Sequence, residues 1–315
     1  MILAASLGLA LLAAYGLACY FTGENLLAAW LDERSLRGQS LAALDDLCQR
    51  NPRRSGLVVT LTTIPSRIDA LAPTLKSLLR QTAAPERILL CVPTWSEREQ
   101  HTTTVPTWIA ALRSVTVVAV PDQGPATKFL STLGTVDPDQ AVVVVDDDRV
   151  YHRRLLATYQ ALAAGRPDAA ITAAGWRVPA DLIDRPTTLR ARLARAPYVP
   201  RRANQVRQPE RTDIVQGVHS YLVRPRFFDL AALGDFSAAP AAVRFVDDVW
   251  ISAHCRAEKW ILPMRLGYTD YQPREHRRRF GRTSLGANVN RATRDAERGN
   301  SVALRHLSAR WRSCG

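Results

Sequence analysis

The clearest pattern in the chain is an alternation of short apolar runs with segments whose leucines recur at helical spacing. The apolar runs lie at 57–62, 87–92, 115–120 and 141–145, and helix-like segments lie at 67–81 and 125–133. Strands that alternate with helices predict a parallel sheet wound by right-handed crossovers. The run at 141–145 ends in four consecutive valines, which is typical of a strand buried on both faces. The pattern therefore predicts an α/β fold, Rossmann-like, with a mostly parallel sheet flanked by helices.

The N-terminal segment 1–23 has a different pattern, because it contains no charged side chain. Its length suffices for one transmembrane helix. A cleaved signal peptide is the alternative, but such a peptide normally carries Lys or Arg before its apolar stretch. We therefore expect an uncleaved, single-pass membrane anchor. The positive charges that follow it favour the cytoplasmic side for the rest of the chain; they are Arg34, Arg37, Arg50, Arg53 and Arg54.

Three further regions complete the predicted organisation. Residues 24–54 have apolar positions at helical spacing, with an interruption near Gly38, and predict a helical juxtamembrane stalk. Residues 55–270 form the α/β domain, and 271–315 a basic C-terminal segment. Two arginine-rich stretches, 185–211 and 274–282, are expected to lack regular structure. The first would be a mobile loop over the pocket or against anionic headgroups, and the second could close on a bound ligand.

Composition adds moderate constraints. Hydrophobic residues make up 47% of the 315 positions, which is ample for a globular core, and the net charge is +13. Such a charge suggests nucleic acid, anionic lipid or phosphorylated ligands. It discriminates weakly, since the cations are nearly all Arg and the chain is rich in Ala, as GC-rich coding produces. Five cysteines without CxxC spacing support neither a disulfide framework nor a zinc site.

The main chemical signal is the triplet Asp146, Asp147 and Asp148, which directly follows the valine run. Burying carboxylates within such a strand is costly, so the acids must lie where the strand ends. Ligands of open α/β sheets bind at that end of the strands, and carboxylates suit a hard divalent cation carrying a phosphorylated substrate. A polar turn is the simpler alternative. The chain contains neither GxGxxG nor GxxxxGK[ST], so a dinucleotide site or a P-loop is not supported.

Several segments, taken in order, resemble GT-A glycosyltransferases. The stretches 58–68 and 74–81 resemble the opening of that fold, where the first strand and its loop hold the nucleotide. The segments 124–128 and 146–148 are similar to its later elements, the second to its DxD motif, and 246–252 resembles the acidic pair that opens the helix beside the acceptor pocket. The resemblance spans roughly 57–266 and implies that 55–270 is a GT-A catalytic domain, family-2-like or exostosin-like.

The resemblance assigns roles to individual residues. It implies that the nucleotide sugar, a UDP-sugar being favoured, binds to Thr62, Thr63, Ile64, Pro65, Arg67, Gly124, Lys128, Asp146 and Asp147. It implies a Mn²⁺ or Mg²⁺ ion held by Asp146 and Asp148, with Asp146 touching the ribose or a metal-bound water. Asp147 is the weakest ligand if the side-chain alternation of a strand continues. His276 would be a third metal ligand by family analogy alone.

The acidic pair Asp247 and Asp248 raises the question of mechanism. If transfer inverts the anomeric centre, either carboxylate is a candidate general base. If transfer retains configuration, the same position would stabilise an oxocarbenium-like state or bind acceptor. Acids at a helix start are also favoured by the helix dipole without any catalytic role.

Three residues are candidates for acceptor binding: Gly217, His219 and Trp250. Gly217 permits close backbone approach to a ligand. His219 is a candidate contact, although an isolated histidine is more often structural. Trp250 could stack on a sugar, although a tryptophan is commonly a core residue.

These expectations combine into one hypothesis. The chain is a membrane-anchored glycosyltransferase of the hexosyl or N-acetylhexosaminyl type, acting on a glycan or lipid-linked acceptor, with no nucleic-acid partner. A nucleotidyltransferase is the closest enzymatic alternative, but its typical glycine-rich loop does not follow the first strand. A non-enzymatic, basic, membrane-tethered binding protein would explain the charge but not the ordered motifs.

Overall fold

The centre of the protein is an eight-stranded sheet with the order β11-β14-β8-β13-β6-β1-β2-β5. The computed structural model describes residues 2–281 and 292–311. Neighbouring strands are parallel except that β13 runs opposite to β6 and β8, and β11 opposite to β14. The strands are β1 (Val58–Thr62), β2 (Arg87–Pro93), β5 (Val115–Val120), β6 (Val142–Val144), β8 (Ala169–Thr172), β11 (Glu210–Arg211), β13 (Tyr221–Val223) and β14 (Glu258–Ile261).

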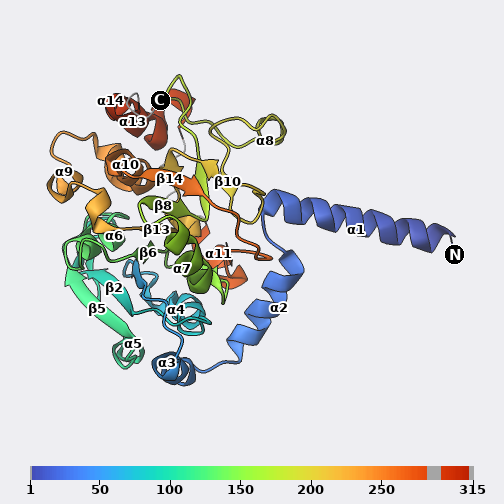
Figure 1. Ribbon diagram of the computed structural model, residues 1–315, viewed down its shortest axis with the longest axis horizontal. Coiled ribbons are helices and arrows are strands. Elements are labelled where there is room, and N and C mark those ends of the chain that lie inside the picture. Colours follow the sequence, from blue (N-terminus) through green and yellow to red (C-terminus); the bar gives the residue numbers. More distant parts are fainter. Residues whose placement is uncertain (1, 282–291, 312–315) are drawn as a thin grey trace.

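Helices cover both faces of this sheet (Figure 1). Those that carry the site and the two cores are α4 (Ala72–Leu79), α5 (Thr107–Ala110), α6 (Thr127–Leu133), α7 (Leu155–Gly165), α9 (Leu230–Gly234), α10 (Asp247–His254), α11 (Arg274–Phe280), α13 (Gly299–His306) and α14 (Ser308–Trp311). Short ribbons flank the sheet; they are β3 (Trp95–Ser96) with β4 (His101–Thr102), β7 (Val150–Tyr151) with β15 (Asp270–Tyr271), and β9 (Ala174–Trp176) between β10 (Arg201–Arg202) and β12 (Ile214–Val215).

The central strands are apolar on both faces because each face packs against helices. In β1, Val59 and Leu61 face the core under α4 and α7, whereas Val58 faces the core under α6 and α10. The valines of β6 divide in the same way, as the period of two in a strand requires. The predicted α/β fold with a mostly parallel sheet is therefore confirmed.

The expected elements agree closely with the observed ones between 57 and 145. The third predicted strand, 115–120, coincides with β5; the predictions for β1 and β2 differ by one residue at one end, and the prediction for β6 by one residue at each end. The helix expected from 67 begins later, since a short 3₁₀ turn, η1 (Ile68–Ala70), precedes α4. Pro73 lies in the first turn of α4, where its missing N–H costs nothing.

The N-terminal region consists of α1 (Ile2–Thr22), α2 (Leu26–Arg37) and α3 (Leu41–Arg50). In this region the side chains are described from Ser6 onward, and among the helices so described no single one is both long and apolar enough to cross a bilayer; Ser6–Thr22 and Leu26–Arg37 meet that test only as a pair, with a bend of 73°. Gly38 ends α2, as the sequence predicts.

The segment expected to be a stalk packs on the domain instead. Arg80, the residue that caps the C-terminus of α4, donates two hydrogen bonds to Asp32 of α2, at 2.8 and 2.5 Å, and the Tyr271 hydroxyl adds a third at 3.0 Å. On α3, the Asp45 carboxylate accepts from the backbone N–H groups of Arg113 and Ser114. These polar contacts were hidden in the sequence, because helical spacing does not identify the surface that a helix packs against.

The C-terminal residues also differ from expectation. Arg274–Phe280, predicted to lack regular structure, forms α11, in which only His276 and Phe280 are buried. Beyond it, Ala303 and Leu304 of α13 belong to the core under α10, so the domain does not end at 270. The remainder of the basic stretch 274–282, residue 282, lies outside the described residues. The stretch 185–211 is mostly irregular and contains only α8 (Leu189–Leu193) and the two-residue strands β10 and β11.

Candidate active site

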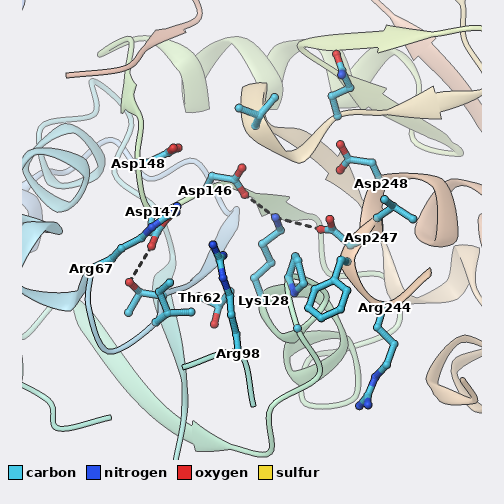
Figure 2. A pocket seen from close by; sticks show the side chains of 18 of the residues that line it. Thr62, Arg67, Arg98, Lys128, Asp146, Asp147, Asp148, Arg244, Asp247 and Asp248 are labelled. Carbon is cyan, nitrogen blue, oxygen red and sulfur yellow. Dashed lines mark hydrogen bonds and ion pairs between the residues drawn. The ribbon is translucent and has the colours of Figure 1, made fainter. Parts of the chain in front are cut away.

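A cavity of about 530 Å³ opens at the sheet edge where the parallel strands end. The loops after β1, β2, β5 and β6 line it (Figure 2), and because β13 is reversed, the residues just before it reach the same edge. Its lining includes Thr62, Thr63, Ile64, Arg67, Arg98, Gly124, Lys128, Asp146, Asp147, Asp148, Arg149, Gln216, Arg244, Asp247, Asp248, Gln272 and Asn300. Most residues predicted for the nucleotide sugar are therefore brought together, whereas Pro65 does not line the cavity.

Lys128 connects the two acidic groups of the cavity. Its ammonium nitrogen lies 2.5 Å from Asp146 Oδ1 and 3.2 Å from Asp247 Oδ2, and Figure 2 shows it between them. Burial opposes a charge on Lys128, but Asp146 and Asp247 outweigh it and hold the pKa of the lysine well above its usual value. Lys128 is thus a fixed, charged group rather than a solvated surface lysine.

Two glycines permit the close packing around this lysine. Gly124 has φ +65°, and a Cβ there would lie 2.7 Å from the carbonyl oxygen of Arg244. At Gly217 a Cβ would lie 3.0 Å from Lys128 Nζ and 3.2 Å from Asp248 Oδ1. The Gly217 N–H donates to that carboxylate oxygen at 2.9 Å. Gly217, expected to approach a ligand closely, therefore approaches the acidic pair itself.

The acidic pair begins α10, with Asp247 and Asp248 in its first turn. Asp247 is held by Lys128, whereas Asp248 accepts a hydrogen bond from a neutral backbone group, the N–H of Gly217. Burial, with a further contribution from Asp247, raises the pKa of Asp248 well above the ordinary range of a carboxyl group. Asp248 therefore holds a proton more strongly than an ordinary carboxyl group does.

Asp147 is held in place by hydrogen bonds to other residues of the protein. Its carboxylate accepts a hydrogen bond from Thr63 at 2.8 Å and a weaker one from Arg67 at 3.4 Å, and its carbonyl accepts one from Thr74 at 2.8 Å. Burial raises the pKa of Asp147 to about 6. These contacts agree with its low rank as a metal ligand.

Asp148 and His276 lie close together at the cavity, and each keeps one polar atom without a partner among the described residues. His276 Nε2 lies 4.0 Å from Asp148 Oδ2, which also accepts a hydrogen bond from Gln272 at 2.9 Å. In the described part of the chain, neither Asp148 Oδ1 nor His276 Nε2 has a hydrogen-bond partner, although both are buried. Burial lowers the pKa of His276, which favours the neutral imidazole, the form that can coordinate a cation.

The structure brings together fewer protein ligands for a metal ion than the three that the sequence predicted. Over residues 2–281 and 292–311, no three His, Cys, Asp or Glu side chains are arranged to hold a metal ion. Asp146, expected to be a ligand, instead forms an ion pair with Lys128. The residues that fit a cation are Asp148 and His276, because they lie close together and each keeps one buried polar atom without a hydrogen-bond partner in the described chain.

None of the three residues predicted for acceptor binding lines the cavity; Gly217 lies behind it against Lys128 and Asp248, and the other two are held elsewhere. Trp250 stacks on Phe236 with ring centroids 4.4 Å apart and donates its indole N–H to the carbonyl of Leu233. His219 Nδ1 lies 3.0 Å from both carboxylate oxygens of buried Asp270. Each is satisfied inside the protein, as polar groups in a core usually are.

Sequence reasoning missed several cavity residues: Arg98, Arg149, Arg244, Gln272 and Asn300. Arg149 directly follows the acidic triplet, and that adjacency was a usable signal. Gln272 lies just before α11, the helix that carries His276, and the sequence analysis did not predict that helix. Asn300 lies at the start of α13, and nothing in the local sequence indicates that this residue lines the cavity.

Comparison with models of known protein families gives no match, and comparison with curated proteins likewise gives no significant similarity.

Proposed function

We propose that the protein is a glycosyltransferase that moves a hexosyl or N-acetylhexosaminyl group from a nucleoside-diphosphate sugar, a UDP-sugar being favoured, to a glycan or lipid-linked acceptor. The observation that carries the proposal is the pair Asp148 and His276, with unpartnered buried atoms, at a cavity that also contains Lys128 and several arginines. Such a wall suits a ligand that brings both phosphate charge and a divalent cation.

The position of the cavity supports a nucleotide as part of that ligand. It lies at the carboxyl ends of β1, β2, β5 and β6, where open α/β sheets bind ligands. The acidic triplet follows β6 and the Thr62–Arg67 loop follows β1, which is the order of the GT-A resemblance. In this proposal the β1 loop, with Arg67 held by Asp147, binds the nucleotide.

Asp148 and His276 would hold Mn²⁺ or Mg²⁺, with diphosphate oxygens and water supplying the other ligands. When bound, the cation supplies Lewis-acid neutralisation of the departing diphosphate. Lys128 adds a fixed positive charge beside the same region and keeps Asp146 and Asp247 in place. Asp146 would then contribute to donor binding in one of two ways: by holding Lys128 in place, or by contacting the ribose of the nucleotide sugar.

Asp248 is the stronger candidate for the general base. Asp247 is committed to Lys128, whereas the raised proton affinity of Asp248 suits a group that accepts the proton of an acceptor hydroxyl. This role requires inversion at the anomeric carbon. A retained configuration in the product would instead assign Asp248 to stabilising positive charge on the sugar.

The N-terminal helix α1 is proposed as the membrane anchor, with the domain on the cytoplasmic side, where nucleotide sugars are available. Its composition carries this part of the proposal: no charged residue precedes Glu24, and positive charges follow it.

The test is thermal stabilisation of the full chain in detergent by UDP or GDP, each with and without Mn²⁺. We expect the nucleoside diphosphate to raise the apparent Tm only in the presence of the cation, and Asp148→Asn and His276→Ala to remove that cation dependence. Asp69→Asn, at an exposed position on η1, is the matched control and keeps it.

Two results would point elsewhere. Stabilisation by nucleic acid without stabilisation by any nucleoside diphosphate would favour the basic binding protein. Release of pyrophosphate from a nucleoside triphosphate and a sugar phosphate would favour the nucleotidyltransferase. Release of nucleoside diphosphate across a panel of donor sugars would identify the donor.

A further inference from the structure

Helix α1 projects away from the domain (Figure 1), and apolar side chains are exposed on it and on α2. Leucines of α1 are largely exposed, for example Leu9 at 69% and Leu12 at 68%. On α2, Leu27, Trp30 and Leu31 are exposed as well. Their spacing of three and four residues places them on one side of that helix.

The opposite side of α2 is the one that packs on the domain. Ala29 and Leu36 are buried in a cluster with Tyr268 and Tyr271. Since α2 already has its partner on that side, Leu27, Trp30 and Leu31 are not needed for folding of the domain. Such a stripe of apolar side chains needs another explanation.

The angle between α1 and α2 is fixed by contacts on both sides of the bend. The Tyr15 hydroxyl donates to Asn25 Oδ1 at 2.8 Å and accepts from the Leu27 N–H at 3.1 Å. From the domain, Asn204 donates to the carbonyl of Gly23 at 2.6 Å and Gln205 to that of Tyr20 at 2.7 Å. The 73° bend is therefore a built feature of the fold.

This bend gives α2 a defined relation to a bilayer crossed by α1. With α1 along the membrane normal, α2 lies within about 17° of the membrane plane, because the bend is 73°. At about 1.5 Å rise per residue, its far end lies only about 5 Å farther from the bilayer than its near end. The exposed apolar residues occupy the near half, and Arg34 follows, with its guanidinium 5.9 Å from the Trp30 ring.

The short helix α8 lies on the other side of the base of α1 (Figure 1). The guanidinium of Arg192 lies 6.0 Å from the ring centre of Phe21, near the end of α1. Leu189 and Leu193 are exposed, at 59% and 69%, and Arg190 is exposed beside them. Apolar side chains mixed with arginines are the composition of a surface that binds anionic lipid.

We propose that the outward faces of α2 and α8 form one membrane-docking surface around the base of α1, and that its partner is a bilayer surface carrying anionic headgroups. The inference rests on the membrane anchor included in the proposed function. It adds that the domain lies against the membrane, with Trp30 at the level of the headgroups, where tryptophan is favoured.

The test uses the full chain reconstituted in vesicles of phosphatidylcholine and phosphatidylglycerol. Nitroxide labels at shallow or deep acyl positions quench the fluorescence of tryptophans that they reach. The difference in quenching between the wild type and Trp30→Phe gives the quenching of Trp30 itself. We expect shallow labels to quench Trp30 more strongly than deep labels. This quenching should fall in pure phosphatidylcholine and in the Arg190→Gln/Arg192→Gln variant.

A matched pair of leucines tests the face itself. Leu31→Ser on α2 should reduce the quenching of Trp30, whereas Leu47→Ser, at 59% exposure on α3, should leave it unchanged. Unquenched Trp30 in a chain that still floats with the vesicles would overturn the docking surface. So would a dimer in detergent that Leu31→Ser dissociates, since the occupant would then be a second copy of the chain.

A chain that fails to float with vesicles at all would overturn the anchor and the docking surface together. The proposed transferase activity is judged separately, because stabilisation by UDP and Mn²⁺ is measured in detergent and does not require lipid.

Discussion

Replacement of Lys128 by methionine tests whether the charge at the centre of the cavity is a structural requirement. The ammonium group of Lys128 lies within 3.2 Å of carboxylates from two different elements, Asp146 after β6 and Asp247 on α10. Lys128→Met keeps the side-chain length and removes the positive charge, so it leaves both carboxylates facing each other without their shared partner.

The expected cost follows from the burial of the three groups. Removing one partner of a buried ion pair typically costs about 3–5 kcal/mol. Lys128 and Asp247 have side-chain exposures of 6% and 11%, but Asp146 is 25% exposed and regains some hydration. We therefore expect a loss of about 3–4 kcal/mol, which corresponds to a fall in apparent Tm of about 5–6 °C for a chain of this size.

Differential scanning fluorimetry of the full chain in detergent measures this loss. Lys259→Met is the matched control, since Lys259 is similarly buried, at 9%, but its ammonium donates only to the carbonyls of Cys255 and Ala257. We expect this control to lose about 1–2 kcal/mol. Equal losses in the two variants would refute the reasoning, because the carboxylates around Lys128 would then add nothing to its role.

Three further predictions follow from single contacts. Gly217→Ala places a Cβ 3.0 Å from Lys128 Nζ, so we expect transfer to slow about tenfold or more, whereas Gly165→Ala, with no atom within 4 Å of the added Cβ, should keep the wild-type rate. Trp250→Phe should lower the apparent Tm, because it removes the hydrogen bond to Leu233, but should leave the midpoint of UDP binding with Mn²⁺ unchanged; a shifted midpoint would contradict the core role of Trp250. Burial, with a smaller effect of Arg154, lowers the pKa of His152 to about 4, so the folded state binds fewer protons and stability is lost as the pH falls from about 6.5 toward 4. After discounting for partial exposure, this loss is about 1–2 kcal/mol. His152→Asn should show a shallower fall of apparent Tm over that range than the wild type, and His101→Asn, at an exposed position, the same fall as the wild type.

The sequence predicted strands β1, β2, β5 and β6 because its information there is local. The central strands among them are apolar runs buried on both faces, so their positions can be found without knowing their neighbours, as for β6 within 141–145. The packing of α2 and α3 on the domain was not predictable in this way, because Asp32 and Asp45 find partners 48 and more than 60 residues away.

In the candidate site, too, residues that local sequence identifies were predicted and residues that depend on the packing of distant elements were not. Residues that follow strands, such as Asp146 and Lys128, were found because the carboxyl ends of parallel strands meet at one edge. Trp250 was misjudged because an aromatic residue three positions after an acid on a helix has the same spacing whether it faces the cavity or the core. The structure places it in the core, against Phe236.

The three consecutive aspartates have three different sets of partners, and this separation has an energetic reason. Adjacent carboxylates repel one another, so each needs its own stabilising group in a buried site. Asp146 has Lys128, Asp147 has Thr63 and Arg67, and Asp148 has Gln272. Of the three, only Asp148 keeps a buried carboxylate oxygen without a partner in the described chain. A divalent cation therefore gains most at Asp148.

A series of asparagine variants tests this order. Asparagine keeps the shape of the side chain and removes its negative charge. Binding of Mn²⁺ to the full chain in the presence of UDP, followed by electron paramagnetic resonance of the free ion, should weaken most in Asp148→Asn. Asp147→Asn should weaken it least, because Thr63 and Arg67 already hold that side chain away from a ligand. Asp146→Asn should be intermediate, since its charge acts on the cation from beside Lys128. If Asp147→Asn weakens Mn²⁺ binding as much as Asp148→Asn, then the middle carboxylate leaves Thr63 and Arg67 when the ligand binds, and the division of roles among the three aspartates is wrong.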